Sequence, residues 1–376
     1  MNLNYHKMKF LRLAFYVLIA QLVLSGCAGE GVEETSSSSS SEINFDAYVG
    51  RNASTRSSIT DIKFLQGSVW NAGFGVFARY GNTHLMDTEH VTWRVDHWGY
   101  DHIRFWPSSG TVDFYAFAPY SPQVRMDKLP DYLADKLVDK THSKDETYID
   151  FPSNMSPVDL IWANQPDQTA PKSPNSKVKF QFKHALIRLG FDITANQELE
   201  EKGAVITVDK VILYGANETS GIFLMAGHLN LKTGDWVPYN NGYSWFYTWT
   251  PTGKVDGKDD EQLKKDGPIY KLSAPQLDNN TPSIANEKDS YIFIIPQDPP
   301  KNFNLMITYR VQQGDLEETV TVRKNLLDVL PKDRNPFGVG GKAYTFHFKL
   351  SLDPVKFDVT TTVVNWNEVK DETMPL

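Results

Sequence analysis

Histidines and carboxylates are the first residues in this 376-residue sequence whose chemistry suggests a site. Four of the nine histidines lie in one short stretch, at His84, His90, His97 and His102. Two of them form a repeated pair with an aspartate, in Asp96-His97 and Asp101-His102. Imidazole and carboxylate groups ligate zinc and related metals. Their spacing is irregular, however, and the stretch around Trp98-Gly99-Tyr100 is typical of a hairpin, so we expect turn and surface residues and no metal site.

Catalytic patterns are otherwise missing from the sequence. His184 would act as a catalytic base only beside a nucleophile, and the one cysteine is Cys27. The sequence contains no Gly-x-Ser-x-Gly, His-Glu-x-x-His, Walker-type or dinucleotide-binding glycine pattern, and its carboxylates are scattered. We therefore expect a protein that is not an enzyme and that needs no cofactor.

Cys27 has a different chemistry, because it ends a secretory signal. Lys7, Lys9 and Arg12 precede the apolar run Leu13–Leu24, which is too short and wrongly flanked for an ordinary membrane span. Leu24-Ser25-Gly26-Cys27 looks like a bacterial lipobox. In such signals the peptide, here residues 1–26, is cut before the cysteine, and the thiol is lipid-modified. The alternative is an apolar leader that ends this way by chance.

Residues 27–42 are predicted to be a disordered tether. Three glutamates, at 30, 33 and 34, and a run of six serines leave this stretch almost no apolar content. An acidic stretch behind a lipidated cysteine resembles the surface-export signals of some Gram-negative anaerobes, whereas the alternative is a plain linker. We expect attachment to the outer membrane through the lipid, with the protein at the cell surface.

Composition limits the function classes. The net charge of −8 and the pI near 5.6 argue against nucleic-acid binding, which requires a basic surface. A single cysteine excludes an intrachain disulfide, so the exported part must be held together by its core. No second apolar run approaches the length of a membrane span.

Apolar and polar residues alternate along nearly all of the exported part. The pattern is clear in Ile43–Val49, Tyr344–Leu352 and Val355–Val363, and it predicts half-buried strands with one wet face. Turn clusters such as Pro107-Ser108-Ser109-Gly110 separate the strands. The fold class is therefore all-β, with sandwiches as the expected architecture and one amphipathic helix near Pro130–Lys140.

The strand Lys177–Thr194 changes its alternation halfway. Apolar residues stand at even positions up to Phe182 and at odd positions from Ala185 onward. A shift of one residue sends side chains to the opposite face, so the chain must bulge or pass between two sheets near Lys183–His184. We place a domain boundary at 195, which gives an N-terminal domain of residues 43–195 and a C-terminal domain of residues 196–376.

Several motifs, in order, resemble the Mfa-like fimbrillin family. They are the lipobox, the first strand Ile43–Val49, Thr55-Arg56-Ser57, Phe74–Ala78, Phe105-Trp106-Pro107, Val112–Tyr120, Phe182–Phe191, Ile294-Ile295-Pro296-Gln297, and the ending Tyr344–Leu350 through Val364-Asn365-Trp366. Each motif is weak alone, and their order over nearly the whole exported chain is more specific.

The resemblance implies a fimbria or pilus subunit built from two tandem transthyretin-like β-sandwich domains. It also implies export as a lipoprotein, removal of the N-terminal strand by an arginine-specific protease, and insertion of a strand from another subunit into the exposed edge. Arg51 and Arg56 follow the first strand in a small, polar stretch and are the candidate cleavage points. Their alternative is a solvated loop. The segment Val359–Trp366 is either the donor strand or an ordinary last strand.

A second class of function is a surface lipoprotein that binds a glycan or a protein without polymerising. Trp236, Trp245 and Trp249 lie in a turn-rich aromatic stretch and would stack on a sugar if at least two of them were exposed and coplanar. The alternative is a strand whose rings fill a core. The expected partners are other fimbrial subunits or a ligand on a host or bacterial surface.

Overall fold

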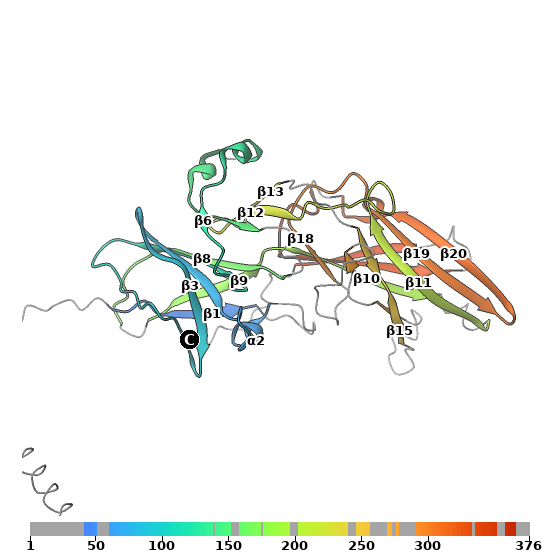
Figure 1. Cartoon of the computed structure of the whole chain (residues 1–376), viewed down its shortest axis with the longest axis horizontal. Helices are drawn as coiled ribbons and strands as arrows, with labels where there is room; N and C mark the ends of the chain where they lie inside the picture. The colour runs from blue at the N-terminus through green and yellow to red at the C-terminus, as the bar shows by residue number, and fades with distance from the viewer. Residues whose placement is uncertain are drawn as a thin grey trace, which may run out of the picture. The chain divides into compact units, whose positions relative to one another are not determined.

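The described part of the computed structural model lies within residues 41–365 and is built mainly from β-strands (Figure 1). The structure describes residues 41–50, 60–137, 140–151, 158–173, 176–195, 202–239, 246–255, 269–272, 276–277, 291–332, 335–351 and 358–365. Strands dominate these residues, so the predicted all-β fold is confirmed. No helix in the described part is long and apolar enough to cross a membrane.

A seven-stranded sheet organises the N-terminal half. Its order is β1-β9-β8-β5-β2-β3-β4. The bounds are β1 Phe45–Val49, β2 Phe74–Tyr80, β3 Thr83–Arg94, β4 His97–Gly99, β5 Val112–Ala118, β8 Ile161–Gln168 and β9 Val178–His184. Strict alternation in β9 buries Val178, Phe180 and Phe182 and exposes the residues between them, because neighbouring side chains of a strand point to opposite faces.

A two-sheet sandwich forms the C-terminal half. One sheet has the order β15-β16-β10-β21-β22, with β18 also paired to β10, and the other has the order β17-β14-β11-β19-β20. The bounds of the first are β10 Ile187–Ala195, β15 Pro251–Val255, β16 Ile269–Leu272, β18 Ile292–Ile294, β21 Lys342–Leu350 and β22 Asp358–Asn365. Those of the second are β11 Ala204–Tyr214, β14 Tyr247–Trp249, β17 Gln276–Leu277, β19 Asn304–Gln313 and β20 Leu316–Asn325. Side chains from both sheets share one apolar core.

A small sheet and short helices complete the described part. The sheet has the order β13-β12-β7-β6, with β6 at Met126–Asp127, β7 at Tyr148–Phe151, β12 at Ala226–Asn230 and β13 at Trp236–Tyr239. The helices are α2 Ile62–Leu65, η1 Asp131–Lys136, η2 Lys140–Lys144 and η4 Leu326–Val329.

The predicted amphipathic helix near Pro130–Lys140 is wrong in type. Two short 3₁₀ helices, η1 and η2, occupy this region, because the backbone at Leu137 turns extended after six residues. Leu133 is the buried side chain of η1, and η2 has none, so little apolar contact supports a longer helix.

The chain passes between sheets where the alternation changes, as the sequence predicts. Strand β9 ends at His184 in the seven-stranded sheet, and β10 begins at Ile187 in the sandwich. Between them, the Ala185 N–H donates to the Leu160 carbonyl, and the Gly341 N–H donates to the Leu186 carbonyl. Side chains of β10 join the core of the C-terminal half. The boundary at 195 stays a prediction.

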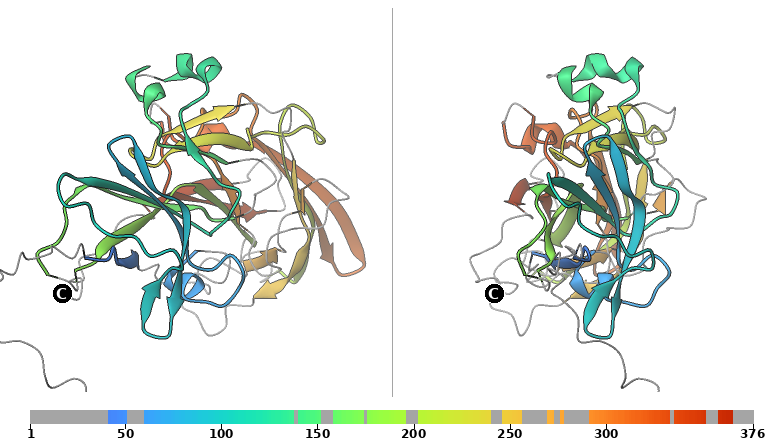
Figure 2. Two further views of the ribbon diagram at one scale, coloured as in Figure 1. Left: turned by 60° about the vertical axis from the view of Figure 1, so that its left-hand side comes forward. Right: turned by 90° about the vertical axis from the view of Figure 1, so that its left-hand side faces the viewer.

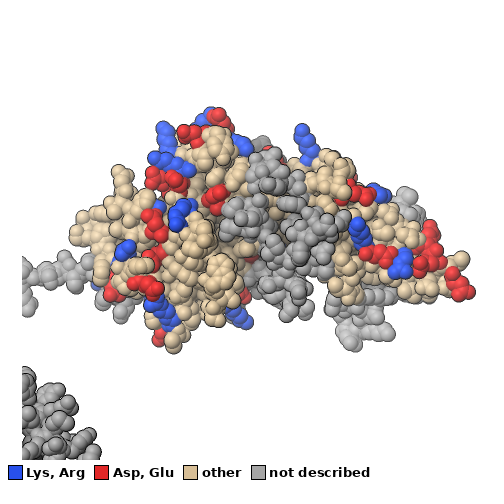
Figure 3. Space-filling model, in the orientation of Figure 1, with Lys and Arg blue, Asp and Glu red and all other residues tan. Residues whose placement is uncertain are grey.

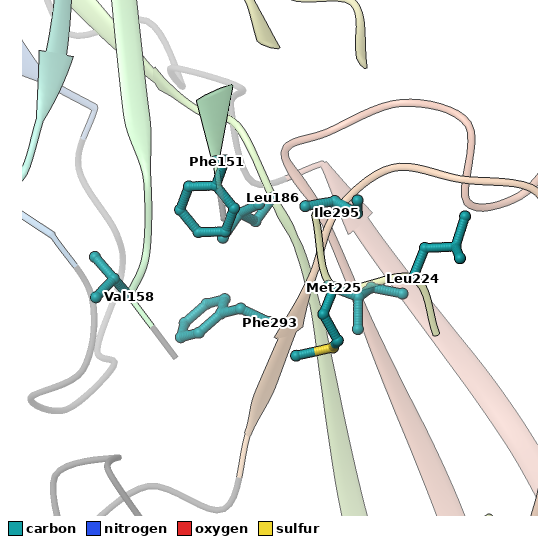
Figure 4. Close-up of a pocket in the computed structure, with 8 residues that line it drawn as sticks. Phe151, Val158, Leu186, Leu224, Met225, Phe293 and Ile295 are labelled. Carbon is teal, nitrogen blue, oxygen red and sulfur yellow. The ribbon is translucent and has the colours of Figure 1, made fainter. Parts of the chain in front are cut away.

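A third apolar cluster lies around this crossing. Figure 4 shows Phe151, Leu186, Phe293 and Ile295 converging on a cavity of about 10 Å³. That volume is close to the smallest that holds one water, and the side chains around it are apolar. The cavity is therefore a small packing defect and not a ligand site.

Candidate assembly site

Strand β1 lies at the edge of the seven-stranded sheet and pairs only with β9 among the described strands. The two strands are parallel, from Phe45 opposite Val178 to Val49 opposite Phe182. Figures 1 and 2 show the blue β1 running beside the green β9. The residues just before β1 are also held, because the Ile43 N–H donates to the Arg104 carbonyl.

The side chains of β1 and of Ile43 just before it fill a deep groove. Ile43 is 0%, Phe45 1% and Val49 6% exposed. The Phe45 ring lies 5.5 Å from that of Tyr100 and 5.7 Å from that of Phe180. Burying each such side chain contributes about 1.5–3 kcal/mol, so this strand supplies a substantial part of the N-terminal core. Its loss would open an apolar groove along β9.

The backbone just before β1 also accepts hydrogen bonds from the groove. The Tyr100 hydroxyl donates to the Ile43 carbonyl at 2.7 Å, and the Val178 N–H donates to the Asn44 carbonyl at 2.7 Å. A strand inserted in place of β1 would need carbonyl groups at equivalent positions to satisfy these buried donors.

Beyond β1 the chain is held again at Thr60 by contacts that do not involve β1. The Thr60 N–H donates to Asp159 Oδ2 at 2.8 Å, and its hydroxyl donates to the Asp159 carbonyl at 2.6 Å. His184 Nδ1 lies 3.1 Å from both carboxylate oxygens of Asp159. These side chains are buried, at 0% exposure for Asp159 and 4% for His184. The attachment is therefore shielded from solvent.

Sequence reasoning missed Asp159 and the role of His184. The signal for Asp159 was a lone carboxylate directly before the apolar run Leu160-Ile161-Trp162. Burial of a carboxylate requires hydrogen-bond donors, and those donors come from Thr60 and His184, far away in the sequence.

Cys27, Arg51, Arg56 and Trp245 lie outside the described residues. Trp236 is half-buried, and its indole Nε1–H donates to the Ala185 carbonyl at 2.9 Å. Trp249 is 1% exposed and packs edge-on to Phe191, at 5.0 Å between ring centroids. A ring so buried cannot stack on a sugar. Trp249 therefore fills the core, which was the alternative to sugar binding.

The four clustered histidines are separate from one another in their contacts. His84 lies between Asp87 and Glu146, whereas His90 bonds to the Ala72 carbonyl and stacks on Tyr120. His97 pairs with Asp96, and His102 pairs with Glu89. Among the described residues, no three His, Cys, Asp or Glu side chains gather as a metal site would require.

Strand β22 lies at the edge of another sheet. It pairs with β21 from Lys342 opposite Asn365 to Lys349 opposite Asp358. Val363 is 38% and Val364 57% exposed, in contrast to the buried apolar residues of β1. Residues 359–365 of the predicted donor segment are thus an outer strand, and Trp366 with the tail lies outside the described residues.

A polar surface pocket of about 330 Å³ lies beside β6, β7 and β12. Arg125, Lys128, Asp127 and Asp150 line it together with His228. Burial lowers the pKa of His228, while the nearby carboxylate of Asp150, 3.8 Å away, acts in the opposite direction. The pocket therefore holds donors and acceptors around an imidazole whose pKa is lowered by burial.

Comparison with known proteins agrees with this architecture. Residues 55–366 match the family described as fimbrillin-like. Fimbrium subunit Fim1C of Phocaeicola vulgatus is 25% identical to this chain, in a match that covers 94% of this chain and 96% of that protein. A crystal structure of a fimbrial protein from Bacteroides vulgatus has the same fold, with a TM-score of 0.54 and 18% identity over 87% of this chain and 99% of that one. Because the family match spans most of the sequence, the chain belongs to the fimbrillin-like family.

Proposed function

We propose that this chain is a structural subunit of cell-surface fimbriae, as a stalk, anchor or tip, and that it is joined to its neighbours by strand complementation at the edge of β9. The family and the relative named as a fimbrium subunit support the fimbrial role. The observation that carries the assembly mode is the segment Ile43–Val49: its strand β1 lies at a sheet edge and pairs with β9 alone among the described strands, and the segment buries Ile43, Phe45 and Val49 deeply.

Maturation begins with export. The signal peptide 1–26 directs the chain out of the cytoplasm, Cys27 receives lipid, and the precursor reaches the outer membrane. A protease then cuts after Arg51 or Arg56, between β1 and Thr60. Because Asp159 holds Thr60 without help from β1, and His184 contacts the Asp159 carboxylate, the remaining chain keeps its attachment when β1 leaves.

The emptied groove then binds a strand from a neighbour. Main-chain hydrogen bonds along β9 provide affinity, and the pockets vacated by Ile43, Phe45 and Val49 select side chains at alternate positions. Strand β22 is the proposed donor, because it is an outer strand with two exposed valines. Within this role the chain has no catalytic function.

Mass spectrometry of the protein from outer membranes and from sheared filaments of the native host tests the proposal. We expect the protein from filaments to begin at Asn52 or Ser57. We expect lipidated Cys27 to be found only in the precursor. Substitution of both Arg51 and Arg56 by Ala should abolish trimming, while Arg94→Ala, at an exposed site in the folded part, should not. Protein with lipidated Cys27 alone, absent from every filament, would overturn polymerisation.

A second candidate function, glycan binding without polymerisation, is favoured by the polar pocket of about 330 Å³. Planar amide, guanidinium and carboxylate groups such as those of Arg125 and Asp150 suit sugar hydroxyls. A glycan array probed with the wild-type protein and with Asp150→Ala tests it. Loss of a reproducible glycan signal in the variant supports this function, and an array with no signal removes it.

A further inference from the structure

A stripe of lysines lies on the outer face of β9. Lys177, Lys179 and Lys183 alternate with the buried residues of this strand and are exposed. Lys183 lies over the Trp162 ring. Besides the hydrogen bond with His97, charge attraction to Lys177 helps to lower the pKa of Asp96, while no ion pair within 4.0 Å joins Lys177 or Lys179 to a carboxylate of the described residues. This face therefore carries positive charge directly beside the edge that β1 covers.

Strand β1 partly offsets that charge. Asp46 stands opposite Lys179 in the parallel register, so both side chains lie on the same face of the sheet. When β1 leaves, Asp46 leaves with it, and the lysines lose their nearest strand neighbour of opposite charge. Trimming thus makes the exposed edge of β9 more positive.

The tip of the β19–β20 hairpin carries the opposite charge. Asp315, Glu317 and Glu318 surround Leu316, and all four are exposed. Glu317 contacts Arg310, while no ion pair within the described part engages Asp315 or Glu318. Figure 3 shows acidic side chains gathered over the end of this hairpin.

The strand order places the two charged surfaces far apart within one copy. From the crossing at His184, β9 leads back about 20 Å to Lys177, since a strand rises about 3.3 Å per residue. From the same crossing, β10 leads the other way to Ala195, which pairs with Leu350 at the end of β21. The hairpin tip lies at this end, because the Tyr309 hydroxyl of β19 donates to the Ser351 carbonyl. One copy therefore cannot neutralise its own stripe.

We propose that the acidic tip of the β19–β20 hairpin of one copy docks on the lysine stripe of β9 of a second copy, head to tail. The proposal rests on the proposed fimbrial function and adds the partner surface to it. Contact between two different surfaces leaves one of each free at the ends, so it continues from copy to copy and forms an open chain unless the rotation closes a ring. Charge attraction also steers the encounter, so docking at the stripe brings the donor to the groove that trimming has opened.

Charge reversal in the exported chain tests this contact. The protein carries Cys27→Ser, is trimmed with an arginine-specific protease, and is followed by sedimentation velocity at low and high salt. Lys177→Glu with Lys179→Glu, or Asp315→Lys with Glu318→Lys, should each weaken association at low salt by about tenfold or more. All four changes in one chain should restore it. The matched control, Lys63→Glu with Lys301→Glu, alters net charge equally at two other exposed lysines and should have little effect.

The outcomes separate the contact from strand complementation. Equal weakening by the control pair, or no recovery in the fourfold variant, overturns the charged contact. Trimmed protein could polymerise and protect the β9 amides from hydrogen exchange while its association is unchanged by salt and by the charge reversals. That result would overturn the charged contact and support strand complementation. If nothing associates under any condition, both fail. Association that is stronger and more salt-sensitive after trimming than before supports the role given to Asp46.

Discussion

Asp159 illustrates how much depends on one buried carboxylate. Its carboxylate accepts from the Thr60 N–H and contacts His184, so replacement by Ala removes the acceptor of a buried N–H and a buried contact of His184. We expect Asp159→Ala to lower the free energy of unfolding by about 2–5 kcal/mol. Urea denaturation followed by tryptophan fluorescence measures it. Asp145→Ala breaks only the exposed pair with Lys232 and should change that free energy by less than about 1 kcal/mol. Equal effects of the two changes would contradict the buried attachment.

His228 provides a prediction on pH. Burial lowers its pKa below the ordinary 6.5, so the unfolded chain binds a proton more readily than the folded one. The stabilisation from this group is complete above the unfolded pKa and is lost as pH falls through the folded pKa. Melting temperatures between about pH 8 and pH 5 should therefore fall less steeply in His228→Asn than in the wild type. Parallel curves would show that His228 does not contribute.

At the scale of elements, β1 is held by its inward side chains. Phe45→Ala should destabilise the precursor by about 3–5 kcal/mol, because it empties a ring-sized space among Tyr100, Phe114 and Phe180. Thermal unfolding measures this loss of stability. The rate of trimming by an arginine-specific protease is a second measurement, and it should increase in the variant. Tyr48→Ala, on the half-exposed outer face, is the control and should have a smaller effect on both.

The sheet crossing depends on a close backbone approach at Gly340. A Cβ atom at this position would lie 2.2 Å from the Ala185 carbonyl oxygen, so the backbone must move to accept it. We expect Gly340→Ala to reduce stability by about 1–3 kcal/mol. The neighbouring change Val339→Ala removes a side chain that is 62% exposed and should be nearly neutral. Chemical denaturation of the two variants compares them, and a neutral Gly340→Ala would argue against tight packing at the crossing.

Some elements differ from the pattern in the sequence for identifiable reasons. The sequence pattern of His102–Trp106 predicts a strand, but the structure has an isolated bridge there between Phe105 and Glu42. Asn164–Ser176 is rich in Pro and Asn, which predicts a loop, yet β8 continues to Gln168 through Pro166. A register irregularity opposite Val112–Phe114 and a positive φ at Asp167 accommodate the proline there. In both cases the residues that pair with the segment lie far away in the sequence, so the segment's own pattern does not predict the pairing.

For the whole molecule, the lipid anchor is the feature that the sequence predicts most directly. Cys27→Ser removes the only thiol, so no acyl chain can be attached at that position. We expect the variant to lose metabolic labelling by palmitate and to leave the detergent phase in a two-phase extraction, while its folded part keeps the wild-type melting temperature. Labelling that persists in the variant would contradict the anchor.

Local pattern was sufficient to determine the all-β fold and the passage of Lys177–Thr194 between two sheets, because alternation directly encodes which face of a strand is buried. Tertiary structure decided what alternation does not encode: which strands are neighbours and which rings are exposed. It placed β1 parallel to β9 at an edge, buried Trp249, and brought Asp159 to Thr60 and His184. Each of these depends on contacts between residues distant in the chain, and no local periodicity specifies such pairs.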